Sequence, residues 1–156
     1  MTLLPPATAR ATVEAELAGA RAWATRHDWT MHWIPEDLVV RAATYHNPVH
    51  RLVEVVAICD SYRALPPAWR FVRPGSDESG GKWFPSAGPG SIFHGNEVIC
   101  APWNRLAYKV HGGPHDDWNE PAAWLQVTGG ITLAHTIADI LAIIDSHLRQ
   151  SPGMMA

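Results

Sequence analysis

One cysteine stands in a part of the chain that is suited to covalent chemistry. Cys100 ends the run SIFHGNEVIC, six residues after His94, and Ala-Pro-Trp follows it. A thiol becomes a useful nucleophile when it is partly exposed and when donors steady the negative charge that develops during acyl transfer. Asn96 is placed to be such a donor, because its amide can hydrogen-bond an oxyanion or brace the loop. We predict Cys100 and Asn96 as the catalytic residues, with an inert thiol at a strand end as the alternative.

A second group of polar residues follows the cysteine on a glycine-rich stretch. The segment HGGPHDDW holds His111, His115, Asp116 and Asp117. Beside a reactive cysteine, these residues and His94 could position an incoming nucleophile or lower its pKa, which is the work of a general base. The spacing C-x10-H-x3-H resembles half of a zinc-finger pattern, but its first ligand pair is missing. We therefore predict supporting residues with no metal and no cofactor, and a solvated polar loop is the alternative.

Three tryptophans and the second cysteine complete the set of candidates. Trp83, Trp103 and Trp118 are predicted to be exposed binding residues, because tryptophan is enriched among binding hot spots. Cys59 ends an alternating strand pattern, RLVEVVAIC, which predicts a buried core thiol. A disulfide between the two cysteines is disfavoured in a reducing compartment.

The composition excludes several classes of protein. The chain has 156 residues, 47% of them apolar, and a net charge of -3, which fits one globular domain over residues 1–156. There is no basic stripe for nucleic acid and no polybasic patch for a membrane surface. No leader pattern and no run of 18 uncharged apolar residues occurs, so we expect a soluble, cytoplasmic protein.

The elements that must position these residues follow from periodicity. Apolar residues three and four apart predict a helix over residues 8–26, and a second such stripe predicts a helix over 132–148 that stops at Ser151-Pro152-Gly153. Residues 37–46, 51–59 and 68–74 are predicted strands of an antiparallel meander. Residues 97–100 are a further strand or an extended segment, whereas residues 101–130 carry no clear period. This order predicts an α+β domain of three to four strands, a long irregular region and a C-terminal helix packed on the sheet.

The same order resembles the catalytic core of the ubiquitin-conjugating enzymes over about residues 8–153. SYRALPPAWRFVRP is similar to the Tyr-Pro…Pro-Pro turn and following strand of that family. His94-Gly95-Asn96 and Ile99-Cys100 resemble its His-Pro-Asn motif and its catalytic cysteine, with Gly95 in place of the proline. The short chain is similar to the divergent bacterial members. Residues 101–130 then form an insertion between the cysteine and the last helix.

The resemblance implies a specific activity and specific partners. Cys100 would accept the C-terminal carboxyl of a ubiquitin-like protein from an activating enzyme as a thioester, and then pass it to an amine of an acceptor protein. Asn96 would support the loop or the oxyanion, and His94 would be structural. Such bacterial pathways are associated with defence against phage. Two alternatives remain: a catalytically silent binding module of the same fold, favoured if Cys100 titrates near or above about 8.5 and resists alkylation, and a small Cys/His metal-binding or hydrolytic protein.

Overall fold

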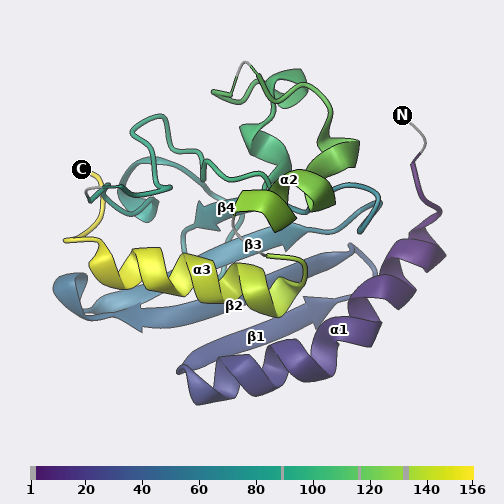
Figure 1. The fold of residues 1–156 in the computed structure, drawn as a ribbon. Helices are drawn as coiled ribbons and strands as arrows, with labels where there is room; N and C mark the ends of the chain where they lie inside the picture. The colour runs from purple at the N-terminus through teal and green to yellow at the C-terminus, as the bar shows by residue number, and fades with distance from the viewer. Residues whose placement is uncertain (1–2, 89, 116, 132–133) are drawn as a thin grey trace.

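The computed structural model describes residues 3–88, 90–115, 117–131 and 134–156. It is an α+β domain in which two helices cover one face of a four-stranded antiparallel sheet (Figure 1). The strands follow one another along the chain and pair in the order β1-β2-β3-β4. The fold class predicted from the sequence is therefore confirmed at this level.

The N-terminal helix, α1, spans Pro6–Arg26 and confirms the predicted helix with a start two residues earlier. Pro6 occupies the first turn, where the missing N–H leaves no helical bond unmade. The stripe of Val13, Leu17, Ala20 and Ala24 is buried. These residues hold α1 against the sheet and against the last helix.

The sheet consists of β1 (Trp29–Ile34), β2 (Val39–His46), β3 (Arg51–Ile58) and β4 (Ala68–Val72). The last three confirm the predicted meander. β1 was not predicted, although Trp29, Met31 and Trp33 alternate with polar residues. The chain leaves α1 and enters β1 within two residues, with Asp28 in the left-handed region at φ 59°, so no turn-rich gap marks the boundary.

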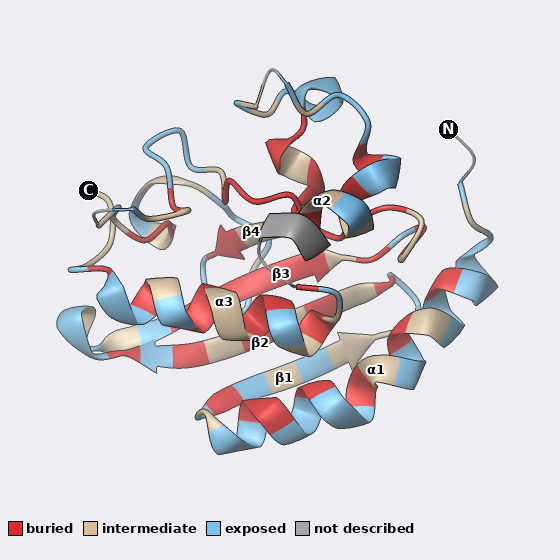
Figure 2. Ribbon diagram, in the orientation of Figure 1, coloured by how far each residue is buried: buried red, intermediate tan, exposed pale blue. Residues whose placement is uncertain are grey.

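Strand register decides which side chains meet the helices. Val40 lies opposite Ala57 and Ala42 opposite Val55, and these residues are at most 1% exposed. Figure 2 shows β3 as the most continuously buried strand, while the outer surface of α1 is exposed. The short connection after β2 is a 3-10 turn, η1 (Asn47–Val49).

The C-terminal helix, α3, spans Ile137–Gln150, packs on α1 and lies over the sheet, where its Asp145 accepts from the Trp29 indole of β1 (Figure 1). The predicted start at residue 132 lies outside the described residues, and the helix itself begins five residues later. Thr136 and Asp139 form a capping box there, with the Asp139 N–H donating to the Thr136 hydroxyl at 3.1 Å. None of the described helices is long and apolar enough to cross a lipid bilayer.

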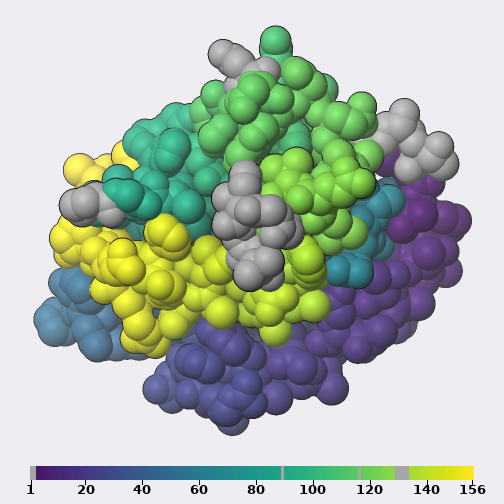
Figure 3. Space-filling model, viewed as in Figure 1, coloured from purple at the N-terminus to yellow at the C-terminus, as the bar shows by residue number. Residues whose placement is uncertain are grey.

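The long irregular region holds four 3-10 turns and one short helix. These are η2 (Gly81–Trp83), η3 (Arg105–Ala107), η4 (Lys109–His111), η5 (Pro121–Ala123) and α2 (Trp124–Ile131). Residues 97–100 do not form a strand, because only the pair Phe93 and Ile99 bridges there. Neither α2 nor the 3-10 turns has the length from which a period could be read. In Figure 3, α3 in yellow separates this teal and green region from the purple N-terminal elements.

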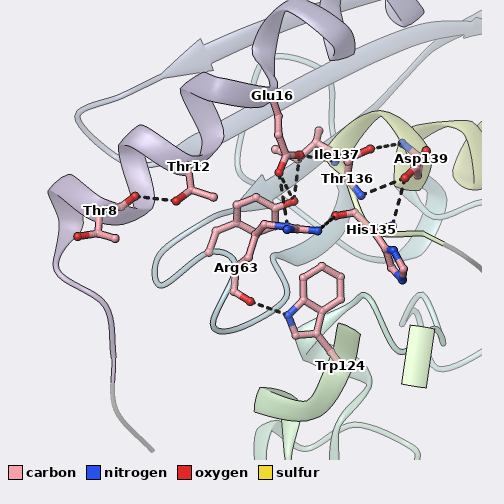
Figure 4. Close-up of polar contacts among 10 residues, drawn as sticks. Thr8, Thr12, Glu16, Arg63, Trp124, His135, Thr136, Ile137 and Asp139 are labelled. Atoms are coloured by element: carbon pink, nitrogen blue, oxygen red, sulfur yellow. Dashed lines mark hydrogen bonds and ion pairs between the residues drawn. The ribbon is translucent and has the colours of Figure 1, made fainter. Parts of the chain in front are cut away.

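A network around Glu16 ties α1 to the rest of the fold (Figure 4). Its carboxylate accepts hydrogen bonds from the Tyr62 hydroxyl at 2.8 Å and from the Ile137 N–H at 2.8 Å. Arg63 forms an ion pair with Glu16 at 3.7 Å, and its backbone carbonyl accepts from the Trp124 indole at 2.9 Å. One carboxylate thus joins α1, the loop after β3 and the start of α3.

Candidate functional site

Cys100 lies at the end of a short backbone ladder in the irregular region. Its N–H donates to the Ile92 carbonyl at 2.8 Å, one step beyond the Phe93 and Ile99 bridge. The residue is 7% exposed, and burial raises the pKa of its thiol to about 11. Within the described part of the chain its sulfur has no hydrogen bond or ion pair. Cys100 is therefore a mostly protonated thiol with a small accessible surface.

Asn104 is the side chain that braces the cysteine. It is fully buried, and its amide N–H donates to the Ile99 carbonyl, the peptide group that joins Cys100, at 2.8 Å. Its amide oxygen accepts from the Trp69 N–H of β4 at 2.8 Å and from the Leu106 N–H at 3.2 Å. Because β4 is an edge strand, this contact also satisfies a backbone donor that has no strand partner. Asn104 was not predicted from the sequence, where its only signal is an asparagine at a turn start.

Arg105 fastens the same segment to the loop after β3. Its guanidinium donates to the Pro66 carbonyl at 3.0 Å and to the Asp60 carboxylate at 2.7 Å. A third bond reaches the Asp60 carbonyl at 2.7 Å. The side chain is only 8% exposed, so these contacts replace the water that a charged group needs. Together Asn104 and Arg105 hold the chain after Cys100 along the edge of the sheet.

Two residues that were predicted to assist Cys100, His94 and Asn96, lie on a turn that precedes it in the chain. The His94 carbonyl accepts from the Glu97 N–H at 2.9 Å, and this turn carries Asn96 at its tip. His94 and Asn96 are both exposed. Within the described residues Asn96 has no hydrogen bond to Cys100, and the side chain that braces the cysteine is Asn104.

The described polar residues that follow the cysteine, in the segment 111–118, pack among themselves. The His115 ring stacks on Trp118 at 3.7 Å and lies 3.9 Å from the Asp117 carboxylate. Gly113 packs against the backbone of Ala107, where an added Cβ would lie 2.3 Å from a carbonyl carbon. His111 is exposed, and partial burial lowers its pKa. Asp116 lies outside the described residues.

In the part of the chain that the structure describes, no cluster of metal-ligating or basic side chains joins the segment 111–118 to the Cys100 thiol. Among the described residues, no group of three His, Cys, Asp or Glu side chains is close enough to hold a metal ion. Within the same residues, Cys100 has no bond to His94, His111, His115 or Asp117. The arrangement therefore offers a braced thiol without an adjacent base.

The three tryptophans have different surroundings. Trp83 and Trp118 are half-buried. The Lys82 ammonium lies 4.9 Å from the centre of the Trp83 ring, and the Arg51 guanidinium lies 5.3 Å from it. The exposure predicted for Trp103 is wrong, because this residue is 0% exposed and packs edge-on against Trp69 at 6.3 Å. Trp103 is buried because it packs on Trp69 of the edge strand β4. This neighbour is distant in the chain, so the local sequence does not reveal the burial.

Cys59 confirms the prediction of a core thiol. It is 0% exposed at the end of β3, and burial raises its pKa strongly. Both cysteines are free thiols. Cys100 is thus the cysteine with accessible surface.

Comparison with known proteins adds no assignment. No protein-family model, curated protein or solved structure matches this chain.

Proposed function

We propose that the protein is a carrier of the ubiquitin-conjugating type, which holds a ubiquitin-like protein as a thioester on Cys100 and transfers it to an amine. The observation that carries this proposal is the braced, slightly exposed Cys100 at the edge of an antiparallel meander. The resemblance of the sequence to that family supplies the reaction, and the order of elements supports it: one helix, four consecutive antiparallel strands, the cysteine in irregular chain, and a final helix on the sheet.

The chemistry of the thiol suits a carrier. The pKa of Cys100 is raised to about 11, so its thiolate is a poor leaving group. A thioester on such a sulfur is lost to water slowly and waits for a positioned amine. The same shift makes the free thiol slow toward ordinary electrophiles, because the thiolate is the reactive form. We expect selective exchange with an activated partner rather than general thiol reactivity.

The transfer has two balanced steps. First the Cys100 thiol gives its proton to solvent and its sulfur attacks the thioester carbonyl on the activating enzyme, whose own cysteine leaves as a thiolate. Then the acceptor amine attacks the new carbonyl, a C–N bond forms, the C–S bond breaks and the Cys100 thiol is restored. The proton that the amine loses passes through solvent to the departing Cys100 sulfur, because none of the described side chains is hydrogen-bonded to this thiol.

The test uses a ubiquitin-like protein activated at its C-terminus as a small-molecule thioester, with and without an activating enzyme and ATP. We expect an adduct on non-reducing gels that dithiothreitol removes. Cys100→Ser should give an adduct that resists dithiothreitol, and Cys59→Ala should behave as the parent. Formation of the adduct by Cys100→Ala would overturn the proposal.

A binding module of the same fold is the second candidate. The observation that favours it is the 7% exposure of Cys100 together with the absence, within the described residues, of a base beside it. The raised pKa of the Cys100 thiol, about 11, also favours a module without catalysis, because little thiolate forms near neutral pH. Binding of the ubiquitin-like protein without any adduct, equally strong in Cys100→Ala, would select the module over the carrier.

A further inference from the structure

A pocket of about 280 Å³ opens at the other end of the sheet, where β2 ends beside the last turns of α3. The end of β2 and its following turn contribute Tyr45, His46, Asn47 and Pro48, and α3 contributes Asp145 and Arg149. Figure 1 shows the connection after β2 next to the C-terminal part of α3. None of the residues assigned to the Cys100 site lines this pocket.

His46 leaves a polar atom unsatisfied in the pocket wall. The residue is 4% exposed, and its Nε2 has no hydrogen-bond partner among the residues that the structure describes. The nearby Ser151 backbone raises the pKa of His46, against the larger lowering by burial. Buried polar atoms are almost always paired in folded proteins, so an orphaned imidazole nitrogen beside a cavity indicates a missing partner.

The charges around His46 are mainly positive. Arg149 donates to Asp145 at 3.1 Å, and the other Asp145 oxygen accepts from the Trp29 indole at 2.9 Å, so both oxygens of this carboxylate are already engaged. Arg51 is the cross-strand neighbour of His46, and neighbours in such a pair have Cβ atoms about 5 Å apart. The Arg51 guanidinium donates to the Lys82 carbonyl at 2.7 Å and lies 5.3 Å from the Trp83 ring centre, and among the described residues it belongs to no ion pair. Arg149 in the pocket wall and Arg51 on the adjoining strand thus outnumber the one carboxylate, Asp145, in a chain whose net charge is -3.

We propose that this pocket binds a small organic anion through its phosphate or carboxylate group. The Arg149 Nε donates to Asp145 and its Nη2 lies 3.5 Å from the His27 carbonyl, which leaves further guanidinium N–H groups for the anion. Arg51 attracts the same charge from the adjoining strand. His46 Nε2 gains its missing partner, either by accepting a proton from a protonated ligand oxygen or by taking up a proton and donating to the anion. Tyr45, 50% exposed, and Pro48 provide the surface for the organic part of the ligand.

The unliganded pocket disfavours a charged His46, which makes binding depend on pH. Burial and the nearby Arg149 lower the pKa of His46, and the Ser151 backbone opposes this shift only in part. Asp145, Arg149 and Arg51 are the charged groups that face it from the packed elements, with Tyr45 beside it on the same strand. An anion between the cations raises that pKa, so binding takes up a proton and weakens as the pH rises above about 6.5.

The experiment is a calorimetric titration of the full chain with phenyl phosphate and with benzoate at constant ionic strength. Inorganic phosphate tests the oxyanion without an organic part, and benzyl alcohol is the uncharged control. We expect saturable binding of at least one organic anion, none of benzyl alcohol, and weaker affinity at pH 8 than at pH 6. Absence of binding by both organic anions, or an affinity independent of pH, would overturn the proposal.

Matched variants locate the site. Arg149→Gln should weaken binding roughly tenfold or more, because it removes a charge-assisted contact. Lys109→Gln removes an exposed charge far from the pocket and should leave affinity unchanged. His46→Gln should abolish the pH dependence, and if that variant does not fold, Arg51→Gln should still weaken binding several-fold. Equal weakening by Lys109→Gln and Arg149→Gln would show a nonspecific charge effect and refute the site.

Discussion

The sheet half of the molecule and its irregular half are stabilised by different kinds of contact. β1 to β4 share backbone ladders, and α1 and α3 bury regular apolar stripes against them. Residues 73–123 have 3-10 turns and depend on a few buried polar side chains, above all Asn104 and Arg105. A ladder spreads its stabilisation over many equivalent bonds, whereas a brace concentrates it in one residue.

The two cysteines follow the same division. Cys59 ends a strand and is sealed by the ladder, while Cys100 lies in irregular chain and depends on the Asn104 brace for its position. Substitution of a single side chain such as Asn104 should therefore change the reactivity of the Cys100 thiol. Four predictions test this contrast.

The largest effect should come from the brace itself. Asn104→Leu removes three hydrogen bonds and leaves the Trp69 N–H and the Ile99 carbonyl buried without partners, so we expect a loss of about 3 kcal/mol in the free energy of unfolding. Thr44→Val on the sheet removes a single bond to the Asp28 carbonyl and should cost about 1 kcal/mol. Urea unfolding of both variants measures the difference, and equal losses would contradict the contrast.

The next effect concerns the thiols. At pH 8, iodoacetamide should modify Cys100 about 10²-fold more slowly than an ordinary thiol, because a pKa of about 11 leaves little thiolate. The rate should rise about tenfold per pH unit below that pKa, and Cys59 should react more slowly still. Single-thiol variants, Cys59→Ala and Cys100→Ala, separate the two by mass spectrometry. Similar rates for both native thiols would break the comparison.

A smaller effect is expected where the two halves meet. Glu16→Ala removes the acceptor shared by Tyr62 and Ile137, and we expect a loss of about 2 kcal/mol in unfolding free energy. Glu14→Ala is the matched control on the same helix, because its contacts with Arg10 and with the Trp33 indole are both exposed and should together contribute less than about 1 kcal/mol. Thermal and urea unfolding of the two variants should rank them in that order.

The smallest effect is the pH dependence of stability. Burial lowers the pKa of His46, His111 and His147 below the ordinary value of 6.5, so the folded state binds fewer protons than the unfolded state. Stability is complete above about pH 6.5 and falls as the pH drops below it. Because His46 and His147 belong to the sheet half, His147→Gln should flatten the curve more than His111→Gln does. If His111→Gln flattened the curve more than His147→Gln does, the irregular half would be the more tightly packed around its histidine.

Elements with a long period could be predicted from the sequence. Four elements could be predicted because their apolar residues repeat over at least one full helical turn or two strand pleats. These elements are α1, β2, β3 and β4. β1 was missed because it follows α1 without a turn-rich gap. The start of α3 was placed too early, since the Thr136 and Asp139 capping box was not used.

The candidate site was predictable only in part. Cys100 was selected by its neighbours in the sequence, and Cys59 was correctly assigned to the core. Asn104, Arg105 and the pocket at His46 were not found, because their partners Trp69, Asp60 and Arg149 lie 35 or more residues away in the chain.

By itself the sequence determined the local periods, the assignment of Cys59 to the core and the loop-rich segment between the last strand and the last helix. Only the tertiary structure decided which asparagine braces Cys100, that Trp103 is buried and Trp83 is not, and that a histidine nitrogen lies orphaned beside a cavity. Periodicity is a property of neighbouring residues. Burial and pairing depend on distant segments that meet only when the sheet closes against its helices.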